Sequence, residues 1–196
     1  MQGGSVGRRL MEQAIARGWE RGLTSIRLVQ AAFNTTSMTL YTKLGFDVRE
    51  PLVCMQGAPI RETIPGITAR KMTPADVGAC NDVCRRVHGF DRAGELPAAI
   101  AEGTAMVAVR SGGDVIGYAT DIGFFGHIVA LENSALLSLI GAADRISGAG
   151  FLLPSRNGEV FRWCLSKGLR MVQPMTLMSL GLYNEPRGAF VPSILY

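Results

Sequence analysis

The sequence predicts an α/β protein with mixed sheets, divided into two segments of unequal length. Three observations predict this class. Apolar residues recur at helical spacing after a glycine-rich start, alternating runs typical of strands separate the helical stretches, and a segment with proline and glycine but no periodicity interrupts them at 56–66. With 196 residues, of which 47% are hydrophobic, the chain can bury a sizeable core.

The first segment, residues 1–56, follows the order loop, helix, strand, helix, strand. The first helix is expected directly after the glycine-rich start, because apolar residues from Val6 to Ile15 share one helical face and Gly18 provides a stop signal. The next strand, helix and strand are expected at 25–33, 34–44 and 46–55.

Residues 57–66 form the predicted linker, and the second segment covers 67–196. After a short strand, Thr73, Pro74 and Asp76 predict a helix start, since the hydroxyl caps, proline occupies the first turn and the carboxylate faces the helix dipole. Two strands flank a hairpin signal at 111–113. The helix that follows Thr73 is expected to run to about residue 87, and further helices are expected at 95–101, 133–145 and 157–167. Further strands are expected at 149–153, at 169–181 and near the C-terminus.

The end of the second segment repeats the strand-helix-strand order of residues 25–55. This order suggests an internal duplication, which rests on the succession of elements and not on a countable repeat of residues.

The distribution of charge argues against a nucleic-acid-binding protein. Residues 1–60 hold 7 Lys/Arg and 4 Asp/Glu, a balance of +3, while residues 61–196 hold 13 and 12, a balance of +1. Arg8, Arg9, Arg17 and Arg21 suit a phosphate-rich ligand, although an ordinary solvated helix face also looks like this. No dense Lys/Arg run with interleaved aromatic residues occurs, so we expect no nucleic acid partner.

The sequence predicts neither a membrane partner nor a secretory leader. Nowhere do eighteen apolar residues follow one another. The first residues lack the basic, apolar and cleavage regions of a secretory signal, so we expect a cytoplasmic protein.

The cysteines agree with a reducing compartment. Four cysteines without framework spacing, at 54, 80, 84 and 164, predict unpaired thiols. Cys80, Cys84 and His88 recur every four residues and could share a metal ion, but cysteine is among the most buried residue types. We therefore predict no metal.

The segment QGGSVGR, residues 2–8, places small residues at the entry to a helix. Unpaired backbone amides and the helix dipole favour an anion there, and glycine lets the backbone approach phosphates closely. A diphosphate would fit. An unstructured N-terminal end is the simpler alternative for a glycine-rich stretch.

Asn34, Ser37 and Tyr41 follow at steps of three and four, which places them on one helix face. A polar stripe that ends in tyrosine is unusual for core packing. The alternative for Tyr41 alone is a half-buried helix tyrosine whose hydroxyl reaches the surface.

Together these two segments resemble the GNAT acetyltransferase family. The family's pyrophosphate loop, Arg/Gln-x-x-Gly-x-Gly/Ala, is similar to Gln2, Gly3, Gly4, Ser5, Val6 and Gly7, with Ser5 where the family usually has glycine. The family's later motif is similar to Asn34, Ser37, Leu40, Tyr41, Lys43, Gly45 and Phe46.

The resemblance implies the GNAT acyl-CoA N-acyltransferase fold and acetyl-CoA as cosubstrate. It implies that residues from Gln2 to Arg8 bind the pyrophosphate, that Asn34 and Ser37 contact the pantetheine, and that Tyr41 is the general acid for the leaving thiolate. The acceptor would be a primary amine of a small molecule or peptide.

The family normally has four strands and two helices before this loop, whereas the loop begins here at residue 2. Residues 1–56 would then be the C-terminal half of a coenzyme-binding domain. We expect the chain alone to be a poor catalyst. We also expect the open edge of its sheet either to associate with a second copy or to dock onto the second segment. No general base is assigned.

Residues 67–196 resemble the C-terminal copy of tandem GNAT proteins, a complete but degenerate domain. Only Gly123 and Gly126 remain of the binding loop, and Phe124 and Phe125 would crowd a diphosphate. His127, Arg156 and Asn157 are candidates for contact with the acceptor. The alternative for His127 is a histidine that satisfies backbone groups beneath a loop. The alternative for Arg156 and Asn157 is an arginine and a helix cap that precede the predicted helix.

A second function class stays open, a non-catalytic CoA-sensing or protein-interaction module that retains the fold. A nucleotide-binding Rossmann domain would need a strand before the glycine loop and an acid about twenty residues further on, and Glu20 and Asp47 are badly placed for this.

Overall fold

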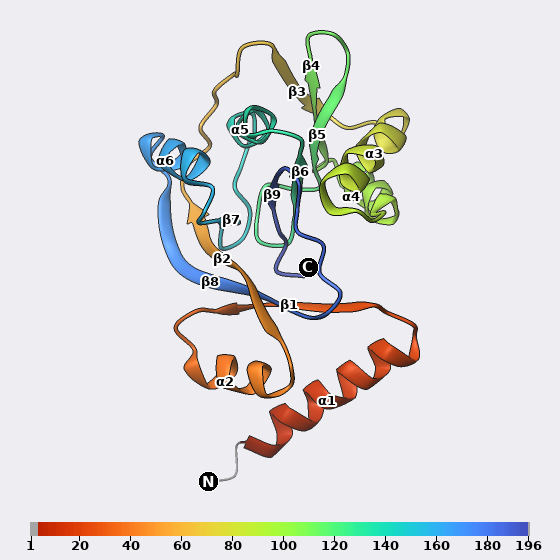
Figure 1. Cartoon of the computed structure of the whole chain (residues 1–196). Helices are drawn as coiled ribbons and strands as arrows, with labels where there is room; N and C mark the ends of the chain where they lie inside the picture. The colour runs from red at the N-terminus through yellow and green to blue at the C-terminus, as the bar shows by residue number, and fades with distance from the viewer. Residues whose placement is uncertain (1–3, 196) are drawn as a thin grey trace.

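The computed structural model describes residues 4–195, and the side chains from residue 6 onward (Figure 1). The first segment has the predicted order of elements. They are α1 (Gly4–Glu20), β1 (Ser25–Ala31), α2 (Thr35–Lys43) and β2 (Asp47–Gln56).

The second segment also contains the predicted helices and strands, with a 3-10 turn at Pro74–Asp76 before α3 and another at Ala93–Glu95 before α4. The helices are α3 (Val77–His88), α4 (Leu96–Ala101), α5 (Asn133–Gly141) and α6 (Gly158–Ser166). The strands are β3 (Ile67–Lys71), β4 (Met106–Arg110), β5 (Val115–Ala119), β6 (Ile128–Ala130), β7 (Phe151–Pro154), β8 (Arg170–Gly181) and β9 (Ala189–Val191).

One strand, β6, was not predicted. Its three residues are all buried, so the alternation of apolar and polar residues that marks a half-exposed strand is missing there.

The strands form two antiparallel sheets, in the orders β3-β4-β5-β6-β9 and β1-β8-β2-β7. In the four-stranded sheet, β8 lies between β1 and β2, and β2 lies between β8 and β7. Strands from both sides of the predicted linker therefore alternate in one sheet.

This alternation does not confirm the predicted arrangement of one half-domain beside one complete domain. The first segment docks onto the second by accepting β8 between its own two strands. The physical reason lies in β8 itself, whose residues from Met175 to Ser179 are all buried, so that this stretch needs neighbours on both edges.

Two helices cover one face of the four-stranded sheet. Figure 1 shows α1 and α2 side by side beneath it. On this face Gly18 of α1 lies against Ile26, and Gln30 contacts Met38 of α2. The opposite face is apolar, with Leu52, Cys54, Leu152, Met175 and Leu177 forming a buried cluster.

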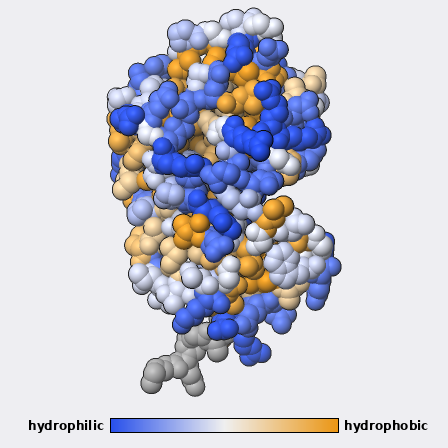
Figure 2. Space-filling view, viewed as in Figure 1, coloured by the Kyte–Doolittle hydropathy of each residue, from blue (hydrophilic) through white to orange (hydrophobic). Residues whose placement is uncertain are grey.

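The five-stranded sheet is packed on both faces, with α3 and α4 on one side and α5 on the other (Figure 1). The space-filling view shows the result, a larger lobe above a smaller one (Figure 2). Within residues 4–195, no helix combines the length and the apolar character that crossing a bilayer requires.

Candidate functional site

The amino end of α1 is the described part of the predicted pyrophosphate loop. Gln2 and Gly3 lie outside the described residues, and so does the side chain of Ser5. The helix begins at Gly4 and has no acidic residue in its first turn, so nothing there offsets the positive end of its dipole. Arg8 lies further along, with Nε 2.8 Å from Glu12 Oε1 in an exposed pair.

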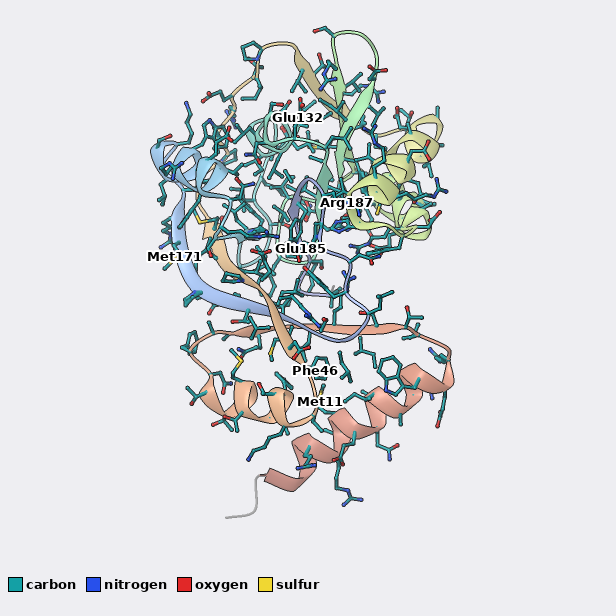
Figure 3. All side chains as sticks on the ribbon, viewed as in Figure 1. Met11, Phe46, Glu132, Met171, Glu185 and Arg187 are labelled. Atoms are coloured by element: carbon teal, nitrogen blue, oxygen red, sulfur yellow. The ribbon has the colours of Figure 1, made fainter. Side chains whose placement is uncertain are left out.

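The beginning of α1 lies close to the second half of α2. A side chain added at Gly7 would meet Leu40 of α2 as its nearest neighbour, at 3.9 Å. Figure 3 shows Met11 of α1 and Phe46 near each other in the space between these helices. The structure thus brings the two sequence motifs to the same face of the sheet.

Asn34 caps α2, because its Oδ1 accepts a hydrogen bond from the Ser37 amide at 3.0 Å. This contact accounts for the spacing of the two residues without a ligand. It does not test their predicted contact with pantetheine.

Tyr41 is half-buried, and its ring meets Phe46 edge-on with the centroids 6.1 Å apart. Phe46 is fully enclosed, so this contact fixes the tyrosine ring against a rigid neighbour. The position suits both the predicted general acid and the alternative of a half-buried helix tyrosine.

Gln30 is a feature that the sequence analysis missed. Its side chain is 6% exposed and its Nε2 donates to Met38 Sδ at 3.7 Å. Within the described part of the chain, Gln30 Oε1 has no hydrogen-bond partner. A buried acceptor beside α2 is costly unless a ligand or another chain satisfies it.

His127 is enclosed in the second segment. Its Nδ1 lies 3.2 Å from Thr120 Oγ1, its Nε2 lies 3.2 Å from Tyr118 Oη, and its amide donates to Thr120 Oγ1 at 3.0 Å. Burial, with Arg92 and His88 nearby, holds the pKa of His127 well below its usual value, so the ring is neutral. The ring thus contacts side-chain hydroxyl groups and not the backbone groups of the alternative, and its predicted contact with the acceptor remains a prediction.

Arg156 binds two carboxylates. Its Nε lies 2.7 Å from Glu50 Oε2, and its Nη2 lies 2.7 Å from Glu185 Oε1. Glu50 is completely buried in β2, next to a bulge at Val48 and Glu50. Burial raises the pKa of Glu50, and Arg156 acts in the opposite direction. The guanidinium is thus already engaged by the protein.

Asn157 caps α6 through its Oδ1, which accepts from the Val160 amide at 3.4 Å, and its Nδ2 donates to Asn133 at 2.8 Å. Arg156 and Asn157 therefore stand at the start of α6, whereas His127 ends the loop between β5 and β6. The structure gives His127 different partners from the other two candidates.

The degenerate loop around Gly123 and Gly126 is closely packed. A side chain at Gly123 would stand 1.8 Å from Ser147 Oγ, and one at Gly126 would stand 2.3 Å from the Asp121 carbonyl oxygen. Phe124 and Phe125 meet edge-on at 5.8 Å. Close backbone packing therefore accounts for these glycines.

The stripe of Cys80, Cys84 and His88 on α3 is buried. Burial raises the pKa of Cys80 to about 12 and lowers the pKa of His88 to about 3, where Arg92 and Arg27 also contribute. Among the described residues, no three His, Cys, Asp or Glu side chains lie close enough to hold a metal ion.

A cleft of about 570 Å³, here called the interlobe cleft, opens between the two lobes. Its walls include Leu23, Arg27, Phe90, Asp91, Glu95 and Leu182. The sequence alone does not predict this cleft, because its walls come from separate parts of the chain. No local motif brings these parts together.

Comparisons with known proteins support the resemblance over part of the chain. Residues 1–46 match the sequence model of the Acetyltransferase (GNAT) family. No curated protein matches the chain by sequence.

Solved structures share the fold over nearly the whole chain. A candidate acetyltransferase from Pyrococcus horikoshii superposes with a TM-score of 0.72 at 17% identity, over 96% of this chain and 66% of its own length. A GCN5-related N-acetyltransferase from Sphaerobacter thermophilus superposes with a TM-score of 0.55 at 17% identity, over 94% of this chain and 70% of its own.

A GCN5-related N-acetyltransferase from Anabaena variabilis gives a TM-score of 0.50 at 14% identity, over 91% of this chain and 51% of its own. This chain thus spans about half to 70% of the length of these structures. It has a mixed α/β fold like theirs, and its match to the GNAT family model lies in residues 1–46.

Proposed function

We propose that the chain belongs to an N-acetyltransferase that transfers the acetyl group of acetyl-CoA to a primary amine of a small molecule or peptide. The observation that carries this proposal is the match of residues 1–46 to the GNAT family, since both motifs fall within these residues and Gly7 of the first lies near Leu40 of the second. The chemistry of the family is acyl transfer.

The described residues are compatible with acetyl-CoA. The amino end of α1 offers unpaired backbone amides and an unopposed dipole to the pyrophosphate. Gly7 leaves an open side at this end, because its nearest neighbour would be the Leu40 side chain at 3.9 Å. The buried Gln30 Oε1 adds an acceptor beside α2. Asn34 and Ser37 remain the proposed pantetheine contacts.

In the proposed reaction, the neutral amine nitrogen bonds to the carbonyl carbon of the thioester and the carbon–sulfur bond breaks. The amine loses one proton to water, and the thiolate gains one. Tyr41 is the proposed donor of the proton that the thiolate gains, it recovers a proton from water, and the Phe46 ring orients it from one side. Such a donor typically contributes 10²- to 10⁴-fold in rate, on the order of magnitude found for general acids.

A CoA-sensing module that retains the fold is the second candidate. Asn34 and Asn157 cap helices and Arg156 forms ion pairs, which is what a fold kept without its chemistry would show. Binding of the coenzyme without turnover distinguishes this candidate from the first.

The test measures binding and turnover separately. Calorimetry with acetyl-CoA gives the Kd, and release of free thiol with a panel of primary amines gives kcat. Tyr41→Phe is expected to lower kcat about 100-fold with an unchanged Kd. Thr39→Ala, an exposed change on α2, is the control. A Tyr41→Phe variant with the kcat of the parent chain would remove Tyr41 from the mechanism, and absence of coenzyme binding would refute both functions.

A further inference from the structure

We infer that the interlobe cleft is a second ligand site, which binds a small molecule carrying a protonated amine on an apolar or aromatic body. Its volume of about 570 Å³ lies within the range of small-molecule sites. The walls combine apolar surface from Leu23, Phe90 and Leu182 with a few charged groups, which is the usual composition of such sites.

The charged groups of the cleft are not equally exposed. The side chains of Asp91 and Glu95 are 54% and 49% exposed, whereas that of Arg92 is 10% exposed. The guanidinium carbon of Arg27 lies 5.1 Å from the ring centroids of both Phe90 and Tyr183, so aromatic rings cover it. Among the charged residues of the cleft, the two carboxylates are therefore more accessible than the Arg92 guanidinium, and this favours a cation.

Glu95 is held in place before any ligand arrives. Arg92 donates from Nε and Nη2 to the two carboxylate oxygens, both at 2.8 Å. His127 Nδ1 lies 3.4 Å from Glu95 Oε2, behind the cleft wall. A carboxylate has about four acceptor positions, so Glu95 can still accept a hydrogen bond from an ammonium group.

Asp91 is fixed in a similar way. Its Oδ1 accepts from the Ala93 amide at 2.8 Å, and its Oδ2 lies 3.1 Å from Arg85 Nη2. The Ala93 amide is the main reason that the pKa of Asp91 is lowered. Two carboxylates thus stand at fixed positions beside Phe90, which lines the cleft together with Leu23 and Leu182.

The cleft is separate from the proposed coenzyme site. Arg27 and Gln30 both belong to β1 but point to opposite faces of the sheet, since Arg27 meets Phe90 while Gln30 meets Met38. The inference therefore does not rest on the proposed function, and its test uses neither acetyl-CoA nor turnover.

The test is a titration of the ¹⁵N-labelled chain with phenethylamine, followed by amide shifts in NMR spectra. Phenylpropanol and phenylpropionate are the neutral and anionic probes of similar size. We expect saturable shifts around Phe90 and Arg27 with the amine and weaker or no saturation with the other two. Glu95→Gln is expected to weaken amine binding about tenfold, while Glu102→Gln, an exposed change outside the cleft, leaves it unchanged.

Leu182→Trp, which fills the cleft from its rim, provides a second variant that leaves both carboxylates in place. This variant is expected to abolish the amide shifts that the amine causes. If Glu95→Gln disturbs the fold, Leu182→Trp alone tests whether the amine binds in the cleft. The inference is overturned if the amine does not saturate below about 10 mM, if the anionic probe binds as well as the amine, or if amine binding survives Leu182→Trp.

Discussion

The pair of Glu50 and Arg156 offers a direct test of how the two segments hold together. Glu50 comes from the first segment and is completely buried, while Arg156 comes from the second and is 53% exposed. Replacing Arg156 by methionine keeps much of the aliphatic stem but leaves the Glu50 carboxylate without its cation. Removing one partner of a buried pair typically costs about 3–5 kcal/mol. Because water reaches half of Arg156, we expect roughly 2 kcal/mol at neutral pH.

This loss should depend on pH. Burial already raises the pKa of Glu50, and Arg156 is the main influence that lowers it, so the variant has a still higher pKa. A carboxyl group whose pKa is higher in the folded state favours folding at low pH, and this contribution is lost as the pH rises through the folded pKa. Arg156→Met should therefore be nearly as stable as the parent at about pH 4, below the unfolded pKa of a glutamate, and clearly less stable at about pH 8.

Urea unfolding followed by circular dichroism measures the free energy of unfolding at both pH values. The expected loss at neutral pH corresponds to a decrease in Tm of roughly 4–8 °C. Arg145→Met, an exposed change, is the control for the loss of a surface charge. Adding Glu50→Gln to Arg156→Met should remove the pH dependence. An equal loss of stability at both pH values would refute the assignment of the effect to a buried, ionised Glu50.

Three further predictions concern other parts of the chain. Asn34→Ala should lower the free energy of unfolding, measured with urea, by about 1 kcal/mol because α2 loses its cap. Asn34→Asp should retain most of the stabilisation that the cap provides. Burial raises the pKa of Cys80 and Cys164 to about 12, so at pH 8 a thiol reagent should label them no faster than the chain unfolds; rapid labelling would contradict their burial. We also propose that two copies associate through the outer edge of β1, which has no partner among the described residues; sedimentation should show concentration-dependent dimers, and a monomer at every concentration would exclude this.

The sequence predicted most elements because their signals are local. Thr73, Pro74 and Asp76 correctly indicate a helical start, but they form a 3-10 turn before α3. Both the amide and the hydroxyl of Thr73 donate to the Asp76 carboxylate, so the carboxylate takes the role that was predicted for the hydroxyl. The turn at 111–113 joins β4 and β5 as expected, with Gly113 at a φ of +94°. In each case the residues that specify the structure are neighbours in the chain.

The features that the sequence did not predict depend on distant residues. Glu50 resembles any polar residue in a strand until Arg156, 106 residues away, is placed beside it. The same holds for the pairing of β1 with β8, in which Ser25 lies opposite Gly181. The interlobe cleft likewise requires the ends of three segments to meet. Local patterns carry no information about such pairs.

The alternation of β1, β8, β2 and β7 links the two segments more closely than the linker at 57–66 does. Without β8, the strands β1 and β2 would have no shared neighbour, and the helices α1 and α2 would cover a sheet with a gap in its middle. Without β2, the buried centre of β8 would lose the neighbour on one of its edges, and β7 would lose its partner. Because an unpaired buried strand leaves amide and carbonyl groups unsatisfied, neither segment can keep its part of this sheet alone. The predicted boundary thus remains a division of the sequence, while the surface that carries Asn34 and Tyr41 is built by both segments.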